Sequence, residues 1–177
     1  MATDFQRRKI SGVFGAMDAD ADGYLTETDF RALTTRWLAL RGTDEGTAEG
    51  QQLAAIMMGW WGTLLAASDL DRDDKVTLDE VLHVVDDLPT MSGAVTGTAD
   101  AMFEAVDENG DGAISAAEYH QLIEAWNGTA TPTDEVFAHL DLDGDGRLSR
   151  EEFTGHWLEF WAGDDPAAPG SWVFGRV

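Results

Sequence analysis

The sequence predicts an all-α protein in which two pairs of helix–loop–helix units pack into one compact globule, with short β contacts between paired loops. Three observations lead to this fold class. An acidic twelve-residue pattern occurs four times along the 177 residues. Apolar residues recur at helical spacing before and after each copy. Each copy also has an apolar residue at its eighth position, where two loops can pair through a short strand.

The fourth copy, residues 141–152, shows the pattern in full. Side-chain oxygens stand at positions one, three, five, nine and twelve, position seven offers a backbone carbonyl, and Gly146 at position six permits a left-handed turn. The residues at the six ligand positions are Asp141, Asp143, Asp145, Arg147, Ser149 and Glu152. A Ca²⁺ ion takes six to eight oxygens at about 2.3–2.6 Å, and this spacing wraps them around one point. The pattern is that of an EF-hand calcium loop.

The three earlier copies carry the same residue types at the same positions. In loop one the predicted ligands are Asp18, Asp20, Asp22, Tyr24, Thr26 and Asp29. In loop two they are Asp69, Asp71, Asp73, Lys75, Thr77 and Glu80. In loop three they are Asp107, Asn109, Asp111, Ala113, Ser115 and Glu118. The apolar residues at position eight, which we expect to pair, are Leu25, Val76, Ile114 and Leu148.

Loops one and two each depart from the pattern once. Asp29 closes loop one, and its carboxylate is one methylene shorter than that of Glu, which favours Mg²⁺ with its six ligands at about 2.0–2.1 Å. Asp74 replaces Gly at position six of loop two, where it must adopt a left-handed backbone. We therefore expect three to four Ca²⁺ sites, tightest in loops three and four, with Mg²⁺ as the alternative ion in loop one.

Residues 1–90 are expected to form the first pair of units. A capping box over residues 3–6 opens the first helix, Gly42 to Gly46 interrupts the chain after the second, and Pro89 ends the fourth. The third helix runs unusually long before loop two. The four apolar faces are, in turn, Phe5, Ile10, Val13, Phe14 and Met17; Phe30, Leu33, Trp37 and Leu40; Leu53, Ile56, Met57, Trp60 and Leu64; and Val81, Val84, Val85 and Leu88.

Residues 91–177 are expected to form the second pair, with a docking tail. Residues 91–97 are predicted to be a short flexible join, and Thr131 with Pro132 is predicted to open the third helix of this half. The apolar faces are Met102, Phe103 and Val106; Tyr119, Leu122, Ile123 and Trp126; Val136, Phe137 and Leu140; and Phe153, Trp157, Phe160 and Trp161. The tail ends in Trp172, Val173 and Phe174, three apolar side chains that suit a groove in the body.

Positions nine and twelve also form a helix-capping pair in three loops. Here the hydroxyl residue caps the exiting helix, and the Glu can reach back to the capping residue's own amide. The pairs are Thr77 with Glu80, Ser115 with Glu118, and Ser149 with Glu152. Metal and cap therefore compete for the same carboxylate.

The composition excludes several kinds of partner. The net charge of −23 argues against nucleic acid and against an anionic membrane surface. Apolar residues make up 44% of the chain and seven Trp are present, which predicts a folded protein rather than an acidic disordered tail. The chain has no Cys, no apolar signal-peptide run at its start and no 18-residue apolar stretch, so we expect a cytoplasmic protein. We also expect a monomer that binds calcium ions, and the sequence identifies no protein partner.

The whole chain resembles the sarcoplasmic calcium-binding protein family, whose bacterial relatives include calerythrin-type proteins. The resemblance rests on four EF-hand loops, a stretched first pair, Asp29 followed by Phe30, and the Trp-Val-Phe-Gly segment from Trp172 to Gly175. It implies two EF-hand pairs packed face to face and a role as an intracellular Ca²⁺/Mg²⁺ buffer. Members of the family often have a degenerate second loop, whereas here every ligand position of that loop is filled.

Three functions remain open at this point. The first is a buffer, favoured by the scattered Met residues, the short join and the apolar tail. The second is a sensor that exposes an apolar groove to a partner when Ca²⁺ binds. The third follows from a resemblance of residues 151–166 to the coelenterazine photoproteins, in which a His stands four residues before a Trp. Here Trp157 occupies that place before Trp161, and His156 lies one residue off. No catalytic triad is recognisable, so we expect no enzyme.

Overall fold

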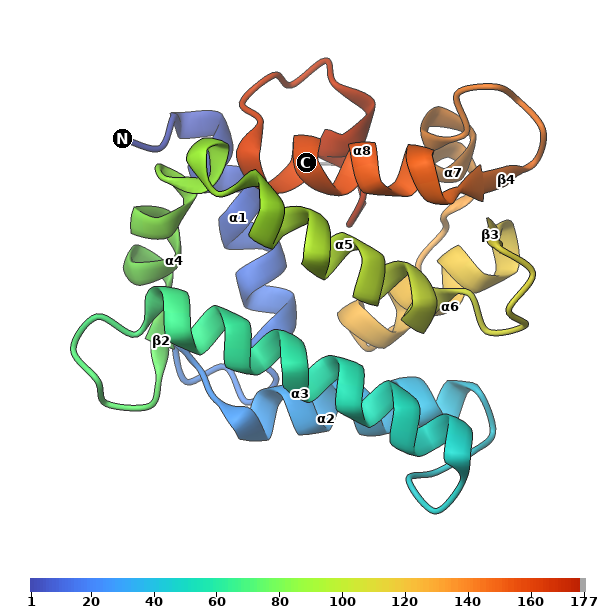
Figure 1. The fold of residues 1–177 in the computed structure, drawn as a ribbon, viewed down its shortest axis with the longest axis horizontal. Helices are drawn as coiled ribbons and strands as arrows, with labels where there is room; N and C mark the ends of the chain where they lie inside the picture. Colours follow the sequence, from blue (N-terminus) through green and yellow to red (C-terminus); the bar gives the residue numbers. More distant parts are fainter. Residues whose placement is uncertain (176–177) are drawn as a thin grey trace.

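A computed structural model describes residues 1–175 and shows helices joined by acidic loops (Figure 1). Within these residues the α-helices are α1 (Asp4–Met17), α2 (Glu27–Leu40), α3 (Ala48–Ser68), α4 (Leu78–Val85), α5 (Ser92–Val106), α6 (Ala116–Asn127), α7 (Asp134–Leu140) and α8 (Arg150–Ala162). Two 3₁₀ helices, η1 (Leu88–Thr90) and η2 (Pro169–Trp172), precede α5 and follow α8. The predicted all-α class is confirmed. None of the described helices combines the length and the apolar character needed to cross a membrane.

Short strands join the loops in pairs, as predicted. Strand β1 (Tyr24–Leu25) pairs antiparallel with β2 (Val76–Thr77), and β3 (Ala113–Ser115) pairs antiparallel with β4 (Arg147–Ser149). The apolar residues at position eight face one another across each pair, Leu25 opposite Val76 and Ile114 opposite Leu148. All four are fully buried. The strand contact therefore ties loop one to loop two and loop three to loop four.

Helix α5 corrects the prediction of a flexible join over residues 91–97. The helix begins at Ser92, so the connection after η1 is a single residue, Met91. Gly93 and Gly97 are poor helix formers, but they lie on the exposed side, whereas Val95 and Ala99 are buried where α5 packs along α8. Burial of one apolar face therefore outweighs the low intrinsic helix propensity of this segment.

The start of α7 also differs from the prediction. The helix begins at Asp134, two residues after Pro132, rather than at Thr131 and Pro132. The amide of Phe137 donates to the carbonyl of Thr133, and the Thr133 hydroxyl lies 3.0 Å from Nδ1 of His120 on α6. Thr133 is thus the N-cap of α7, and its hydroxyl contacts α6 instead of capping the helix.

The centre of the molecule is a cluster of aromatic side chains drawn from both halves of the sequence. Trp60 of α3 stacks on Trp126 of α6 at 5.6 Å and lies 5.7 Å from Trp157 of α8. The tail after η2 completes this cluster, because the ring of Phe174 lies 5.6 Å from Trp126 and 4.9 Å from Phe160. The Tyr119 hydroxyl donates to the carbonyl of Val173 at 3.0 Å and holds the tail in place.

Three basic side chains of the first half bind the last carbonyls of helices in the second half. They are Lys9 of α1, Arg36 of α2, and Arg41, the C-cap of α2. The last carbonyls of a helix have no partner within it, and a cation there is favourable. The contacts are Lys9 to Glu159 (3.2 Å) and Gly163 (2.8 Å) at the end of α8, Arg36 to Ala125 (2.8 Å) and Trp126 (3.3 Å) at the end of α6, and Arg41 to Ala105 at the end of α5. These ties join the two halves into one body, while the division at residue 90 stays a prediction.

Candidate metal centres

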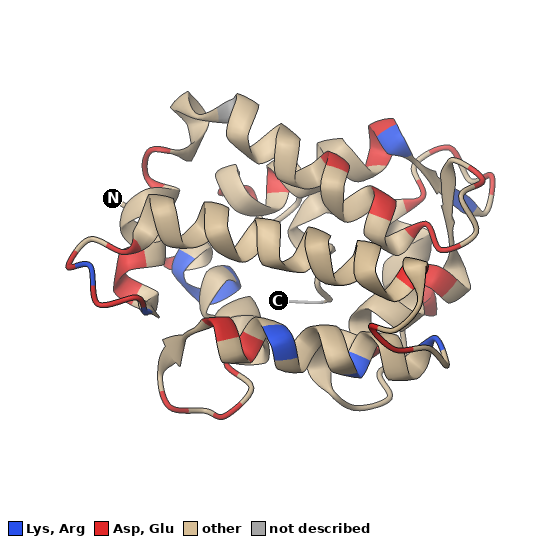
Figure 2. Ribbon diagram, turned by 60° about the horizontal axis from the view of Figure 1, so that its bottom comes forward, with Lys and Arg blue, Asp and Glu red and all other residues tan. Residues whose placement is uncertain are grey.

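The four acidic loops lie between consecutive helices: α1 and α2, α3 and α4, α5 and α6, α7 and α8. Figure 2 shows that Asp and Glu gather in these loops, whereas Lys and Arg are few and lie mainly on helices. In every loop the first ligand position is the C-cap of the entering helix and the ninth is the N-cap of the exiting helix. The helix ends therefore set the positions of the loop carboxylates.

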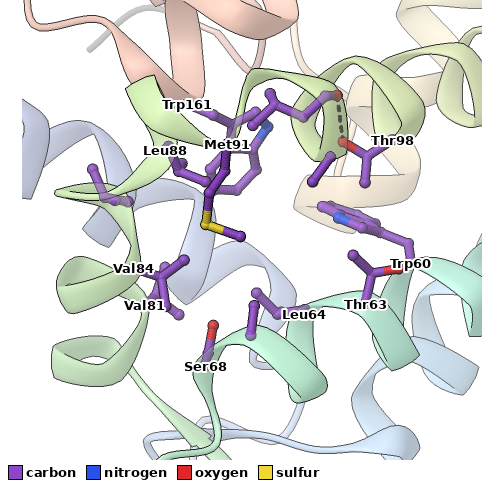
Figure 3. Close-up of a pocket in the computed structure, with 14 residues that line it drawn as sticks. Trp60, Thr63, Leu64, Ser68, Val81, Val84, Leu88, Met91, Thr98 and Trp161 are labelled. Carbon is purple, nitrogen blue, oxygen red and sulfur yellow. Dashed lines mark hydrogen bonds between the residues drawn. The ribbon is translucent and has the colours of Figure 1, made fainter.

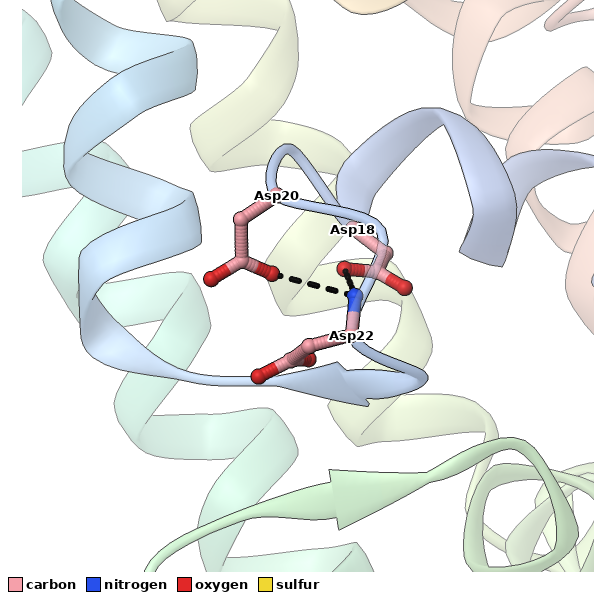
Figure 4. Close-up of side chains that lie close together, drawn as sticks. All are labelled: Asp18, Asp20 and Asp22. Atoms are coloured by element: carbon pink, nitrogen blue, oxygen red, sulfur yellow. Dashed lines mark hydrogen bonds between the residues drawn. The ribbon is translucent and has the colours of Figure 1, made fainter.

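Loop one brings three carboxylates together. Oxygens of Asp18, Asp20 and Asp22 all lie within 4.8 Å of one another (Figure 4). The amide of Asp22 donates to Oδ1 of Asp18 at 3.1 Å and to Oδ1 of Asp20 at 3.2 Å, and the amide of Gly23 donates to Oδ2 of Asp18 at 2.8 Å. The backbone thus holds acidic oxygens around one point before any cation is considered.

Loops two and four form comparable clusters, and loop three does not. Oxygens of Asp69, Asp71 and Asp73 lie within 4.8 Å of one another, as do those of Asp141, Asp143 and Glu152. Across residues 1–175, no three carboxylates of loop three lie this close together, and Asn109 takes the third position of this loop. The Asn109 amide oxygen faces inward all the same, since it accepts a hydrogen bond from the amide of Asp111 at 3.0 Å.

The backbone of every loop turns left-handed twice. At position six φ is +87° for Gly23, +63° for Asp74, +82° for Gly112 and +83° for Gly146, which confirms the conformation expected of Asp74. The second left-handed residue stands at position four: Ala21, Arg72, Gly110 and Gly144. This second turn was not predicted, because Ala21 and Arg72 are residue types that carry no signal for it.

The carboxylate at position twelve already binds backbone amides. Glu152 accepts from the amide of Ser149 at 2.9 Å and from that of Leu142 at 3.1 Å, and its own amide donates to the Ser149 hydroxyl at 3.1 Å. Glu80 and Glu118 make the same reciprocal contacts with Thr77 and Ser115. The predicted capping pairs are confirmed, so these carboxylates can serve the helix cap as well as a metal.

Loop one has a related arrangement, with Asp29 in place of Glu. Asp29, although shorter, accepts from the amide of Thr26 at 2.8 Å, from the Thr26 hydroxyl at 3.0 Å and from the amide of Ala19 at 3.0 Å. Its side chain is almost wholly buried. Asp29 therefore belongs to the backbone frame of loop one.

The pKa values of the loop acids follow from this crowding. Restricted access to water, together with the charges of Asp22 and Asp29, raises the pKa of Asp20 above its ordinary value. Restricted hydration and the neighbouring charge of Asp73 likewise raise the pKa of Asp71. Glu80 differs, because the hydrogen bonds from Thr77 and Leu70 outweigh its desolvation and lower its pKa.

Asp143 follows the other third-position acids. The hydrogen bond from the Asp145 amide lowers the pKa of Asp143, but partial desolvation and the charges of Asp145 and Glu152 leave it above its ordinary value. Crowded carboxylates of this kind are the groups that a divalent cation relieves of mutual repulsion.

Side chains at position seven form contacts across each loop pair that the sequence did not indicate. Lys75 lies over the ring of Tyr24 at 4.9 Å, and Arg147 lies 3.4 Å from a carboxylate oxygen of Asp111. Tyr24, Ala113 and Arg147 lie in strands and Lys75 directly precedes one, which puts their carbonyls at the edge of the loop. The assignment of all these positions as ligands remains a prediction.

Known families and proteins share the sequence pattern of these loops. The family model for an EF-hand domain pair matches residues 98–158, and that for a single EF hand matches residues 10–34. A probable calcium-binding protein, CML29, of Oryza sativa subsp. japonica is 33% identical over 144 residues, which is 79% of this chain and 75% of that protein. Calerythrin of Saccharopolyspora erythraea is 26% identical, covering 86% of this chain and 89% of that protein. The alpha chain of the sarcoplasmic calcium-binding protein of Penaeus vannamei is 25% identical, covering 90% and 89%.

Solved structures share the fold. A calcium-binding protein of Streptomyces coelicolor superposes with a TM-score of 0.71 at 25% identity, covering 89% of this chain and 98% of that one. The coelenterazine-binding protein of Renilla muelleri gives a TM-score of 0.78 at 18% identity, covering 99% and 100%, and shows the fold alone. Acid-lined loops paired between helices define a calcium-binding protein. The chain belongs to the EF-hand family, in its group of sarcoplasmic calcium-binding proteins and calerythrin.

Proposed function

We propose that this EF-hand protein acts as a Ca²⁺/Mg²⁺ buffer in the cytoplasm rather than as a sensor. A sensor must present an apolar groove to a partner when Ca²⁺ binds. Here the chain's own tail fills that space, with Val173 buried and Phe174 packed on Trp126, Trp157 and Phe160. This occupied groove is the observation that carries the proposal.

Contacts between helices also favour a buffer that stays closed. Nε2 of His156 on α8 lies 2.6 Å from the carbonyl of Leu140, the last residue of α7, and so ties the two helices that flank loop four. Arg36 and Arg41 tie α2, which leaves loop one, to the ends of α6 and α5. Opening of either unit would break these contacts and leave buried polar groups without partners, which is unfavourable.

We propose that the four loops bind three to four Ca²⁺ ions and that Mg²⁺ competes with Ca²⁺ in loop one. The six positions of each loop named from the sequence supply the ligands, side-chain oxygens at five and a backbone carbonyl at position seven. The −23 net charge and the acid clusters favour cations, so the proposed partner is Ca²⁺. We propose in addition that the chain is a monomer and that it catalyses no reaction.

A sensor function is the second candidate, because the structure of the Streptomyces coelicolor protein is described as a basis for calcium-mediated regulation. Titration of the metal-free protein with Ca²⁺, with and without millimolar Mg²⁺, followed by an apolar fluorescent dye, separates the two functions. For a buffer we expect tight Ca²⁺ binding that Mg²⁺ weakens, and little change in dye binding between Mg²⁺ and Ca²⁺. A large rise in dye binding specific to Ca²⁺ would favour the sensor.

A further inference from the structure

An apolar pocket lies beside loop two, between α3, α4 and α5, with α8 behind it (Figure 3). Its volume is about 110 Å³, and its walls include Trp60, Leu64, Val84, Met91 and Trp161. The tail does not fill this space, because Phe174 packs on Trp126, Phe160 and Trp161 and is not among the residues that line the pocket. The pocket is therefore a feature that the metal-binding function does not use.

Two buried polar atoms in the pocket wall lack partners. Among the described residues, four buried side-chain nitrogen or oxygen atoms make no hydrogen bond, and two of them, Oγ of Ser68 and Nε1 of Trp161, belong to residues that line this pocket. Ser68 is 0% exposed and Trp161 is 8% exposed. Figure 3 shows the Ser68 hydroxyl turned into the pocket, towards Met91.

Other polar side chains at the same wall are satisfied. The Thr98 hydroxyl donates to the carbonyl of Val95 at 2.7 Å and accepts from Nε1 of Trp157 at 3.0 Å, and the Thr63 hydroxyl donates to the carbonyl of Gly59 at 3.0 Å. Buried polar groups in folded proteins are nearly always paired, so an orphaned hydroxyl facing an apolar pocket needs an explanation. A bound molecule with a matching oxygen provides one.

The pocket limits what that molecule can be. An enclosed apolar cavity of about 150 Å³ accommodates benzene. This pocket is somewhat smaller but is open on one side, so it holds at most a molecule of one ring. The wall offers no charged partner, and a charge buried without one is strongly unfavourable. We propose that the pocket binds an uncharged one-ring molecule with a hydroxyl group, a simple phenol, whose oxygen bonds to Ser68.

The two helices of the loop-two unit form much of the wall. Ser68 ends α3 and directly precedes Asp69, the first predicted ligand of loop two, and Val81 directly follows Glu80, the last. The angle between α3 and α4 therefore shapes both the pocket and the loop. For this reason the test uses the full chain saturated with Ca²⁺.

Three probes of one ring separate the contributions: phenol, benzene and benzoate, titrated against protein labelled with ¹³C at the methionine methyl groups. We expect a saturable shift of the Met91 methyl with phenol and with benzene, no shift of Met17 in the core, and no binding of the charged benzoate. The added hydrogen bond should make phenol bind about fivefold more tightly than benzene. A Met91 signal that does not saturate, or equal affinities for phenol and benzene, overturns the proposal.

Variants identify the group that recognises the oxygen. Ser68→Ala should remove the roughly fivefold preference for phenol while benzene binding persists. Thr63→Val, which removes a hydroxyl that already has a partner, is the matched control and should keep the preference. Val84→Phe should fill the pocket and abolish binding of both probes, with the melting temperature confirming that it folds. An unchanged preference in Ser68→Ala refutes the assignment.

Discussion

The two loop pairs share their ligand spacing but differ in how the backbone reaches it. In loops three and four, all four left-handed positions are Gly: Gly110, Gly112, Gly144 and Gly146. In loops one and two, three of the four are other residues: Ala21, Arg72 and Asp74. A left-handed residue other than Gly costs about 1–2 kcal/mol. The same set of ligand oxygens is therefore held with more backbone strain in the first pair than in the second.

The two halves also contribute different groups to the contacts between them. The first half supplies Lys9, Arg36 and Arg41, and the second half supplies the helix ends that these cations bind. The second half carries the tail that closes the aromatic cluster. The half that contains loops one and two is therefore held by contacts with the second half. This suggests that loops one and two keep their shape through tertiary contacts, whereas loops three and four keep theirs through Gly.

The largest expected effect is the loss of stability on removing metal. Each site held at a hundred times its dissociation constant adds about 2.7 kcal/mol to the free energy of unfolding, so two tight sites add roughly 5 kcal/mol. We expect the melting temperature to fall steeply when a chelator replaces Ca²⁺. A melting temperature that chelation leaves unchanged would contradict the proposed function.

Variants at position twelve show which pair of loops contributes more of this stabilisation. Glu152→Gln should weaken loop four at least tenfold, because a contact of about 1.5 kcal/mol to an ionised group is lost. Glu80→Gln should reduce Ca²⁺ binding less at low Ca²⁺ concentration, because loop two is expected to be the weaker site and to be little occupied there. Glu151→Gln removes an exposed neighbouring charge and serves as the control. Calorimetric titration measures all three. If Glu80→Gln has the larger effect, the ranking of the pairs is reversed.

A pH dependence of about 2 kcal/mol is expected from the tie between α1 and α8. Burial lowers the pKa of the Lys9 ammonium from 10.5 to about 8, and the charges of Asp164 and Glu159 offset part of that shift. Between pH 8 and pH 10.5 the unfolded chain keeps the proton that the folded chain releases, so stability from this group rises with pH across that window. Below pH 8 both states hold the proton and the dependence ends.

Urea unfolding of the wild type and Lys9→Met in saturating Ca²⁺ tests this sign. The advantage of the wild type over Lys9→Met should be about 2 kcal/mol larger at pH 9.5 than at pH 7.5. Arg8→Met removes a cation from an exposed neighbouring position and should show no such difference. An advantage that shrinks as the pH rises would mean that the carbonyls of Glu159 and Gly163 outweigh the cost of burying the charged ammonium.

The sequence predicted the parts of this structure that depend on local spacing. The clustering of the loop-one carboxylates, the pairing of Leu25 with Val76, and the cap made by Glu152 are set within a dozen residues or by a repeated pattern. The sequence did not predict features that depend on contacts with distant residues or that have no signature in the residue type. The helix over residues 92–106 forms because Val95 is buried, and the left-handed turn at Arg72 has no signature in its residue type.

An exchange at position six tests backbone strain directly. Asp74→Gly should relieve about 1 kcal/mol in loop two and strengthen its Ca²⁺ binding roughly fivefold. Asp74→Asn removes the same charge but keeps a side chain, and so controls for electrostatics. Gly146→Ala should weaken loop four by a similar factor. Calorimetry of the three variants gives the comparison, and equal effects of Asp74→Gly and Asp74→Asn would show that charge, not strain, separates the loops.

The smallest expected effect concerns the choice of ion in loop one. Asp29 and Glu80 bind equivalent backbone amides: Asp29 those of Ala19 and Thr26, at 3.0 and 2.8 Å, and Glu80 those of Leu70 and Thr77, at 3.1 and 2.8 Å. Because the amide frame is the same, the longer side chain of Asp29→Glu can keep the cap and still extend towards the ion.

We therefore expect Asp29→Glu to raise the ratio of Ca²⁺ to Mg²⁺ affinity in loop one roughly fivefold, about the worth of one added contact. The seven-coordinate geometry that Ca²⁺ accepts gains from a second carboxylate oxygen, whereas six-coordinate Mg²⁺ does not. Competition calorimetry of Ca²⁺ against Mg²⁺ measures the ratio, and Glu80→Asp should lower it in loop two. A crystal structure with seven-coordinate Ca²⁺ and a bidentate Asp29, together with an unchanged ratio in Asp29→Glu, would show that side-chain length does not set the ion preference of this loop.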